Sequence, residues 1–148
     1  MSKPLPSRIL GIDYGMARSG LALSDERKII AFPWMVFPME KKVEQNVVKL
    51  IQAIEKHTKE HHYFLEAIVV GLPFMMNGKV GLIADEVKTF IAELQKFISI
   101  PIVKWDERLS SVQAERSLRE SSLSRKRRSK IVDAVSAVII LQSYLDHK

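Results

Sequence analysis

The spacing of apolar and polar positions predicts that the chain begins with three short strands. Apolar runs cover residues 8–14, 19–24 and 28–37, and short turns separate them. Pro33 marks a bulge or a sheet edge in the third run, because proline cannot donate a hydrogen bond within a sheet. Three strands joined by short turns predict an antiparallel meander.

The rest of the chain switches between helical and strand patterns. Apolar residues recur about every 3.6 positions in 40–62, which predicts a helix with one buried face. The run 65–72 has a continuous apolar core, as in a strand covered on both faces, and a glycine-containing loop follows at 71–81. We expect a fifth strand at 101–105 and further helices at 82–98, 110–120 and 130–145.

The order of these elements is β-β-β-α-β-α-β-α-α. This order predicts an α/β fold with a five-stranded mixed sheet and helices on both of its faces. A chain of 148 residues is long enough to bury a core, so we expect a single domain over 1–148.

Composition removes several function classes. The chain has no cysteine, which excludes disulfides, zinc sites with thiolate ligands and a cysteine nucleophile. Its first residues contain no apolar run typical of a signal peptide, and no run approaches the ~18 apolar residues of a membrane span. We therefore expect a cytoplasmic protein with no membrane partner.

Positive charge is concentrated near the C-terminus. The net charge is +6, and residues 104–130 alone contain nine Lys or Arg against four Asp or Glu. A concentrated basic block suggests an anionic polymer such as nucleic acid as a partner. The alternative is a solvated face that keeps the protein in solution.

Acidic residues occupy positions where burying a carboxylate is costly. Asp13 ends the first apolar run, and Asp106 and Glu107 follow the fifth strand. Asp133 continues an apolar stripe of the helix at 130–145. If the strands at 8–14, 65–72 and 101–105 are neighbours, their carboxyl ends bring the acids and the loop at 71–81 together.

Converging carboxylates repel one another and are stable mainly around a cation. Their hard oxygen ligands favour magnesium or manganese. A site of this kind beside a basic surface indicates hydrolysis of phosphodiester bonds, with bound ions that activate water and stabilise the leaving oxygen.

Each acid also has a local alternative. Asp13 could cap a turn, and Asp133 could lie in the first helical turn, where the helix dipole favours a negative charge. Asp106 or Ser110 could cap the helix at 110–120, and Gln113 would complete a capping box with Ser110.

Other side chains are weaker candidates. His57 and His61 are four residues apart on a helix, but they lie in a polar terminal turn and we expect them on the solvated surface. Trp105 could stack on a base, although a tryptophan in a buried strand is more typical of the core.

Four stretches together carry a family resemblance, and they span nearly the whole chain: GIDYGMARSGLALSD, VVGLPFMMNGKVG, VKWDERLSSVQAER and SRKRRSKIVDAVSAVIILQSYLD. In content and order they resemble the YqgF/RuvX family, described as Holliday junction resolvases and as pre-16S rRNA nucleases. The resemblance implies an RNase H-like fold and a metal-dependent endonuclease.

The resemblance also implies residue roles. Asp13 matches the family's first-strand acid and Asp133 its last-helix acid, while the third acid falls in D-E-R, with Glu107 slightly favoured over Asp106. Asp13, Glu107 and Asp133 would then hold Mg²⁺ or Mn²⁺. The residues expected to engage phosphates are Arg18, Arg108, Arg125, Lys126, Arg127, Arg128 and Lys130.

The chain departs from the family pattern in one loop. Where the family usually reads G-L-P-x-N-M-D-G, Met75 replaces the asparagine and Asn77 replaces the aspartate. Asparagine serves a turn as well as aspartate does, so we expect the turn to persist. If the family's aspartate binds metal or substrate, activity would be altered.

Three functions follow from this reading. The first is a magnesium-dependent endonuclease, a hydrolase that processes the 5′ end of pre-16S rRNA or acts as a Holliday junction resolvase in DNA recombination and repair. The second is a non-catalytic nucleic-acid-binding factor in ribosome maturation. The third is a nucleotide-handling protein, which one short domain without a P-loop disfavours. Partners would be pre-rRNA or branched DNA and a ribosomal precursor, bound by a monomer or a homodimer.

Overall fold

A computed structural model describes residues 4–72, 82–109 and 125–148, and the side chains of 82–83 and 125–134 fall outside the description. The elements in chain order are β1 (Ser7–Asp13), β2 (Arg18–Ser24), β3 (Ala31–Pro38), α1 (Val43–His61), β4 (Phe64–Leu72), α2 (Leu82–Gln95), β5 (Ile102–Asp106), the short 3₁₀ helix η1 (Glu107–Leu109) and α4 (Arg125–Asp146).

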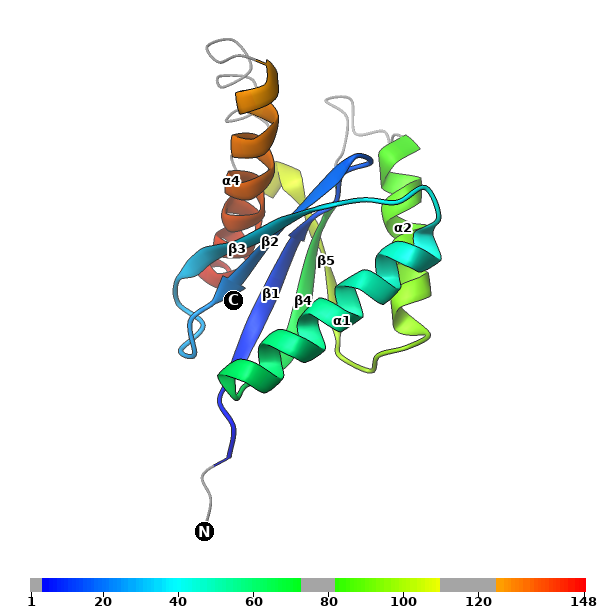
Figure 1. Cartoon of the computed structure of the whole chain (residues 1–148). Coiled ribbons are helices and arrows are strands. Elements are labelled where there is room, and N and C mark those ends of the chain that lie inside the picture. The colour runs from blue at the N-terminus through cyan, green and yellow to red at the C-terminus, as the bar shows by residue number, and fades with distance from the viewer. Residues whose placement is uncertain (1–3, 73–81, 110–124) are drawn as a thin grey trace.

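The five strands form one mixed sheet in the order β3-β2-β1-β4-β5 (Figure 1). β1 and β2, and β2 and β3, pair antiparallel, which confirms the predicted meander. β4 pairs parallel with both β1 and β5. The carboxyl ends of β1, β4 and β5 therefore lie at the same end of the sheet, as the sequence predicted.

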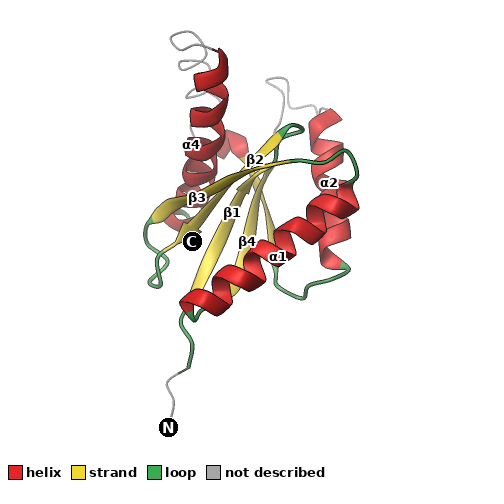
Figure 2. Cartoon of the chain, in the orientation of Figure 1, coloured by secondary structure: helices red, strands yellow, loops and turns green. Residues whose placement is uncertain are grey.

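Helices cover both faces of this sheet, as predicted. Figure 2 shows α1 and α2 on one side and α4 on the other. Successive residues of a strand point to opposite faces, so Leu10 joins the core under α1 and α2 while Ile9 joins the core under α4. Phe90 of α2 and Leu141 of α4 are buried in these two cores.

Two glycines let α4 lie close to the sheet. A Cβ atom at Gly11 of β1 would lie 2.7 Å from the Cβ of Leu141, and one at Gly71 of β4 would lie 2.6 Å from Cδ1 of Ile140. Both distances are too short for real carbon atoms, so a larger residue at Gly11 would push α4 away through Leu141, and one at Gly71 would force the Ile140 side chain to move.

Several element boundaries differ from the prediction, by three residues at the start of β3, at the start of α1 and at the end of α2. β3 begins at Ala31 rather than at 28, because the Asp25 carboxylate accepts the N–H groups of Ile29 and Ile30 and holds a turn there. α1 begins at Val43 rather than at 40.

The last helix also begins earlier than expected. α4 begins at Arg125, so residues 125–129, ahead of the predicted start at 130, are also helical. Lysine and arginine are good helix formers, which explains the extension. Asp133 is consequently the ninth residue of α4 and not part of its first turn, which removes the helix-start alternative for this acid.

Two predictions concern residues that the structure does not describe. One is the helix at 110–120, with the capping box of Ser110 and Gln113. The other is the altered loop, with Met75 and Asn77. Both lie outside the described residues. No helix in the described ranges is long and apolar enough to cross a bilayer.

Candidate functional site

Asp13 is the last residue of β1 and is only 3% exposed. It pairs with Gly20 of β2 across a tight turn. The N–H of Gly15 donates to Oγ of Ser19 at 3.1 Å, and a Cβ on Gly15 would overlap the carbonyl oxygen of Arg18. The turn therefore requires glycine at position 15 and fixes the backbone that carries the carboxylate.

Glu107 is the first residue of η1 and is 1% exposed. Its Oε1 would lie 3.3 Å from a Cβ built on Gly71, so this carboxylate lies against the end of β4. Ile12 pairs with Val70, and continuing that parallel register places Asp13 level with Gly71. Asp13 at the end of β1 and Glu107 after β5 are thus two buried carboxylates on either side of the end of β4.

Asp106 is arranged differently from its neighbour. Its side chain is 25% exposed, and its Oδ1 accepts the backbone N–H of Arg108 at 2.8 Å. It also accepts hydrogen bonds from the Arg108 guanidinium, which lowers the pKa of Asp106. Asp106 therefore caps η1, whereas the Glu107 side chain is buried.

Asp133 lies on α4, and its side chain is outside the description. Helical periodicity places this position on the same stripe as Ala137 and Ile140, which are both fully buried against the sheet. Figure 1 shows the N-terminal part of α4 at the end of the sheet where β1 terminates.

The donor set suits a hard divalent cation. Two buried carboxylates supply oxygen ligands, the chemistry that Mg²⁺ and Mn²⁺ prefer. Among the described side chains no group of three His, Cys, Asp or Glu residues is placed to hold a metal. The third expected ligand, Asp133, is not among those side chains.

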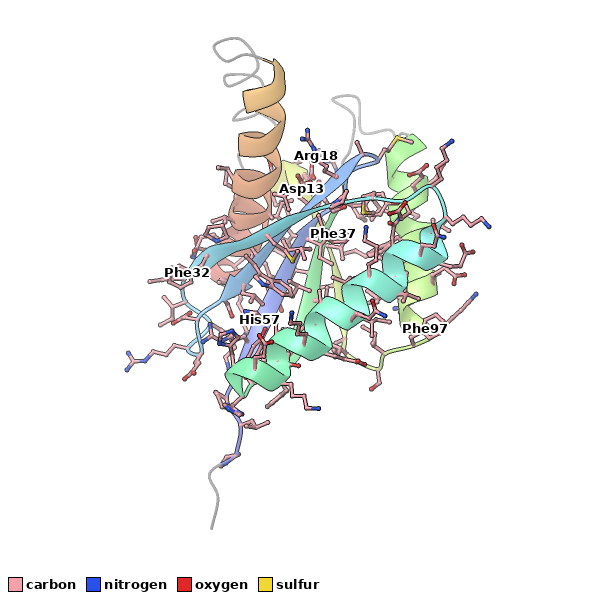
Figure 3. All side chains as sticks on the ribbon, viewed as in Figure 1. Asp13, Arg18, Phe32, Phe37, His57 and Phe97 are labelled. Atoms are coloured by element: carbon pink, nitrogen blue, oxygen red, sulfur yellow. The ribbon has the colours of Figure 1, made fainter. Side chains whose placement is uncertain are left out.

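Basic residues lie around this edge. Arg18 begins β2 and is half-buried, and Figure 3 shows it beside Asp13 at the same end of the sheet. Arg108 is exposed directly after Glu107. Residues 125–130 form the N-terminal turns of α4, and the set expected to meet phosphates there is Arg125, Lys126, Arg127, Arg128 and Lys130.

Tyr14, the residue directly after β1, contacts α2, and the sequence did not predict this contact. The Tyr14 ring packs against Phe90 at 5.1 Å between ring centroids. Burial raises the pKa of Tyr14, and a hydrogen bond to the Glu86 carboxylate raises it further. This contact links the turn after Asp13 to α2. The only sequence signal for this contact is that Tyr14 directly follows Asp13.

The weaker candidates Trp105 and His57 make structural contacts. Trp105 packs in the core under α4, and its Nε1–H donates to Oγ of Ser143 at 3.0 Å, which confirms a structural role. The solvated position predicted for His57 is wrong, because this residue is half-buried and its Nδ1 lies 2.7 Å from the Tyr63 hydroxyl. His61 is exposed as expected. Figure 3 shows His57 at the other end of the sheet from Asp13.

Comparison with known proteins places the chain among nucleases. A family model described as "RuvX: Holliday junction resolvase" matches residues 7–147. A protein of Protochlamydia amoebophila named "Putative pre-16S rRNA nuclease" is 60% identical over 147 residues, covering 99% of this chain and 98% of that protein. A protein of the same name from Halothermothrix orenii is 41% identical over 141 residues, covering 95% and 96%.

Solved structures agree on the fold. The structure of T. thermophilus RuvC in complex with a Holliday junction substrate superimposes with a TM-score of 0.55 at 14% identity, covering 95% of this chain and 96% of that one. The fold is therefore the RNase H-like fold of RuvC-type resolvases, which confirms the predicted fold class.

Proposed function

The chain belongs to the RuvX family, and from this membership we propose that it is a magnesium-dependent endonuclease that cuts structured nucleic acid. The substrate we propose is the 5′ end of pre-16S rRNA, because relatives that match along almost their whole length carry the name of a nuclease for that RNA. Cleavage of this RNA would belong to ribosome maturation.

The observation that carries the proposal is the pair of buried carboxylates at one sheet edge. Asp13 and Glu107 are 3% and 1% exposed, and they follow or end β1 and β5, the two strands that flank β4. Burying a charged carboxylate is costly unless something positive compensates it. A divalent cation provides that compensation and is the group that nucleic-acid hydrolysis at such a site uses.

In this mechanism Asp13, Glu107 and Asp133 hold one or two Mg²⁺ ions. When bound, such ions lower the pKa of a coordinated water and stabilise the departing oxygen. Gly15 closes the turn directly after Asp13, because a Cβ at this position would overlap the Arg18 carbonyl oxygen. Arg18 and Arg108 bind phosphate groups at the rim, and the basic turns of α4 hold the flanking backbone.

A second substrate is favoured by one observation, the description of the matching family model as a Holliday junction resolvase. The same carboxylates would then cut a four-way DNA junction. A non-catalytic binding factor in ribosome maturation is the remaining alternative, and it differs from both nucleases in that it binds without turnover.

Cleavage assays separate these functions. Purified protein is incubated with an RNA that spans the 5′ end of 16S rRNA and with a four-way DNA junction, each with Mg²⁺ and with EDTA. We expect Mg²⁺-dependent cuts in the RNA. Asp13→Asn and Glu107→Gln should each lower the rate by roughly 100-fold or more, because each removes a charged oxygen ligand.

Glu60→Gln is the matched control, since Glu60 is an exposed acid of α1. It should cleave like the wild type. Cleavage in EDTA, or unchanged rates in Asp13→Asn, would refute the mechanism. Tight binding without any cleavage under Mg²⁺ or Mn²⁺ would identify a binding factor instead.

A further inference from the structure

Asp106 and Arg108 form a tightly connected pair at the end of β5. The backbone N–H of Arg108 donates to Oδ1 of Asp106 at 2.8 Å. Its Nε donates to Oδ1 at 3.2 Å and to Oδ2 at 3.1 Å, and Nη2 donates to Oδ2 at 2.8 Å. Both carboxylate oxygens of Asp106 therefore face one guanidinium, in the two-point geometry that fixes its plane as well as its position.

This pairing orders a side chain that would otherwise be mobile. The Arg108 side chain is 48% exposed, and an exposed arginine has several freely rotating bonds. Held at Nε and Nη2, the guanidinium has a defined direction before any substrate arrives. Ordering it in advance lowers the entropy lost when it binds a phosphate.

The ordered guanidinium lies beside the candidate metal centre. Arg108 directly follows Glu107, whose carboxylate is buried against Gly71. Asp106 pairs with Leu72 at the end of β4, so the pair belongs to the same sheet edge as Asp13. A substrate phosphate next to the cleaved bond would lie close to Asp106 and Arg108.

We propose that Asp106 is a positioning residue, which holds the Arg108 guanidinium for contact with a substrate phosphate that flanks the cleaved bond. This role rests on the proposed nuclease function. It differs from metal binding, because the Asp106 oxygens accept hydrogen bonds from Arg108 and would have to give them up to reach a cation.

The two roles of Asp106 predict opposite signs in a binding experiment. Asp106→Asn removes a negative charge, and charge alone would strengthen binding to nucleic acid. If Asp106 positions Arg108, binding weakens instead. We expect the dissociation constant for the 5′ rRNA fragment, measured by fluorescence anisotropy in EDTA, to rise by roughly fivefold because the two-point contact is lost.

A double-mutant cycle tests the coupling. Asp106→Asn should not weaken binding further in an Arg108→Ala background, because the residue that it positions is gone and only the effect of the lost negative charge remains. Arg108→Lys keeps the charge but cannot form the fork contact, so it should weaken binding as Asp106→Asn does. Thermal unfolding of each variant shows whether it is folded, and Arg108→Lys supplies the test if Asp106→Asn is not.

Glu93→Gln is the matched control. Glu93 pairs with exposed Lys96 at 2.7 Å on α2, so this change removes the same charge from an ion pair away from the site. It should leave binding unchanged or slightly stronger. Tighter binding by Asp106→Asn, or a full additional loss in the Arg108→Ala background, would overturn the positioning role.

Cleavage distinguishes the positioning role from the metal role. In Mg²⁺, Asp106→Asn should raise KM and leave the half-saturating Mg²⁺ concentration unchanged, and a shift of that concentration would make Asp106 a ligand. If the wild type binds but never cuts, the proposed function fails while the anisotropy cycle still reports on the pair. If it binds and cuts but the cycle is additive, only the positioning role fails.

Discussion

At the residue scale, the Glu107 carboxylate depends on the missing side chain of Gly71. A Cβ at this position would lie 2.6 Å from Ile140 Cδ1 and 3.3 Å from Glu107 Oε1. One small residue therefore sets both how closely α4 packs and where a candidate metal ligand lies. Gly11 serves the first purpose alone, since its neighbours are Leu141 and Ala137.

This difference between the two glycines can be tested. Gly11→Ala should destabilise the fold by about 1–3 kcal/mol, because the Leu141 Cβ can move only with α4, and Gly71→Ala should cost less, because the end of the Ile140 side chain can rotate away. Only Gly71→Ala should also lower the rate of Mg²⁺-dependent cleavage at a temperature where both variants are folded, since it alone crowds Glu107. Urea unfolding and single-turnover cleavage measure the two effects. Equal rates for the two variants would contradict this assignment.

At the element scale, the C-terminal end of α1 is held by contacts of His57. Its Nδ1 lies 2.7 Å from the Tyr63 hydroxyl, and its ring lies between those of Trp34 and His61, at 4.8 and 4.2 Å between centroids. Burial lowers the pKa of His57, and the positive charges of His61 and Arg8 lower it further. Burial also raises the pKa of Tyr63 to about 12, so its hydroxyl stays protonated and can donate to neutral His57.

These contacts predict that stability depends on pH. The folded pKa of His57 lies below its unfolded value of about 6.5, so the unfolded chain binds more protons as pH falls. The contribution of His57 is thus complete above about pH 6.5 and is lost as pH falls below it. His57→Gln should lower the free energy of unfolding at pH 8 by about 1 kcal/mol through the lost hydrogen bond and flatten its decline toward pH 5.5.

Urea titrations at pH 8 and pH 5.5 measure this change. His62→Asn is the control, because His62 is exposed and has a positive φ of 54° that asparagine tolerates. It should keep the decline of the wild type. An unaltered decline in His57→Gln would show that another group is responsible.

Elements with strong periodicity could be predicted from the sequence, and their ends could not. Short apolar runs located the five strands, and 3.6-residue spacing located α1. The start of α4 was misplaced because two effects compete at 125–130. The helix dipole opposes basic residues in a first turn, whereas lysine and arginine favour the helix itself, and the second effect prevailed.

The candidate site could likewise be predicted only in part from the sequence. The order of strands placed Asp13 and the D-E-R stretch at one edge, because parallel strands share their carboxyl ends. Which acid of that stretch is buried depends on η1, a turn that Asp106 caps by accepting the Arg108 N–H. The Tyr14 contact with Phe90 also escaped prediction, since it joins residues 76 positions apart by a packing detail that periodicity does not encode.

At the scale of the whole molecule, one end of the sheet collects the features of a nuclease. Asp13 at the end of β1 and Glu107 directly after β5 are the two buried carboxylates, and Arg18 and Arg108 lie at the same end of the sheet. The N-terminal turns of α4 add the basic stretch 125–130 at this end (Figure 1). The opposite end carries the His57 contacts and none of these groups among the described residues (Figure 3).

The central claim is that Asp13, Glu107 and Asp133 form a metal centre. The most direct test is a crystal of the full chain soaked in Mn²⁺, with anomalous scattering recorded to locate the ions. We expect one or two Mn²⁺ peaks within about 2.0–2.3 Å of carboxylate oxygens of Asp13, Glu107 and Asp133, with Asp106 still bound to Arg108. Peaks at Asp106 in place of Glu107, or no Mn²⁺ at this edge of the sheet, would contradict it.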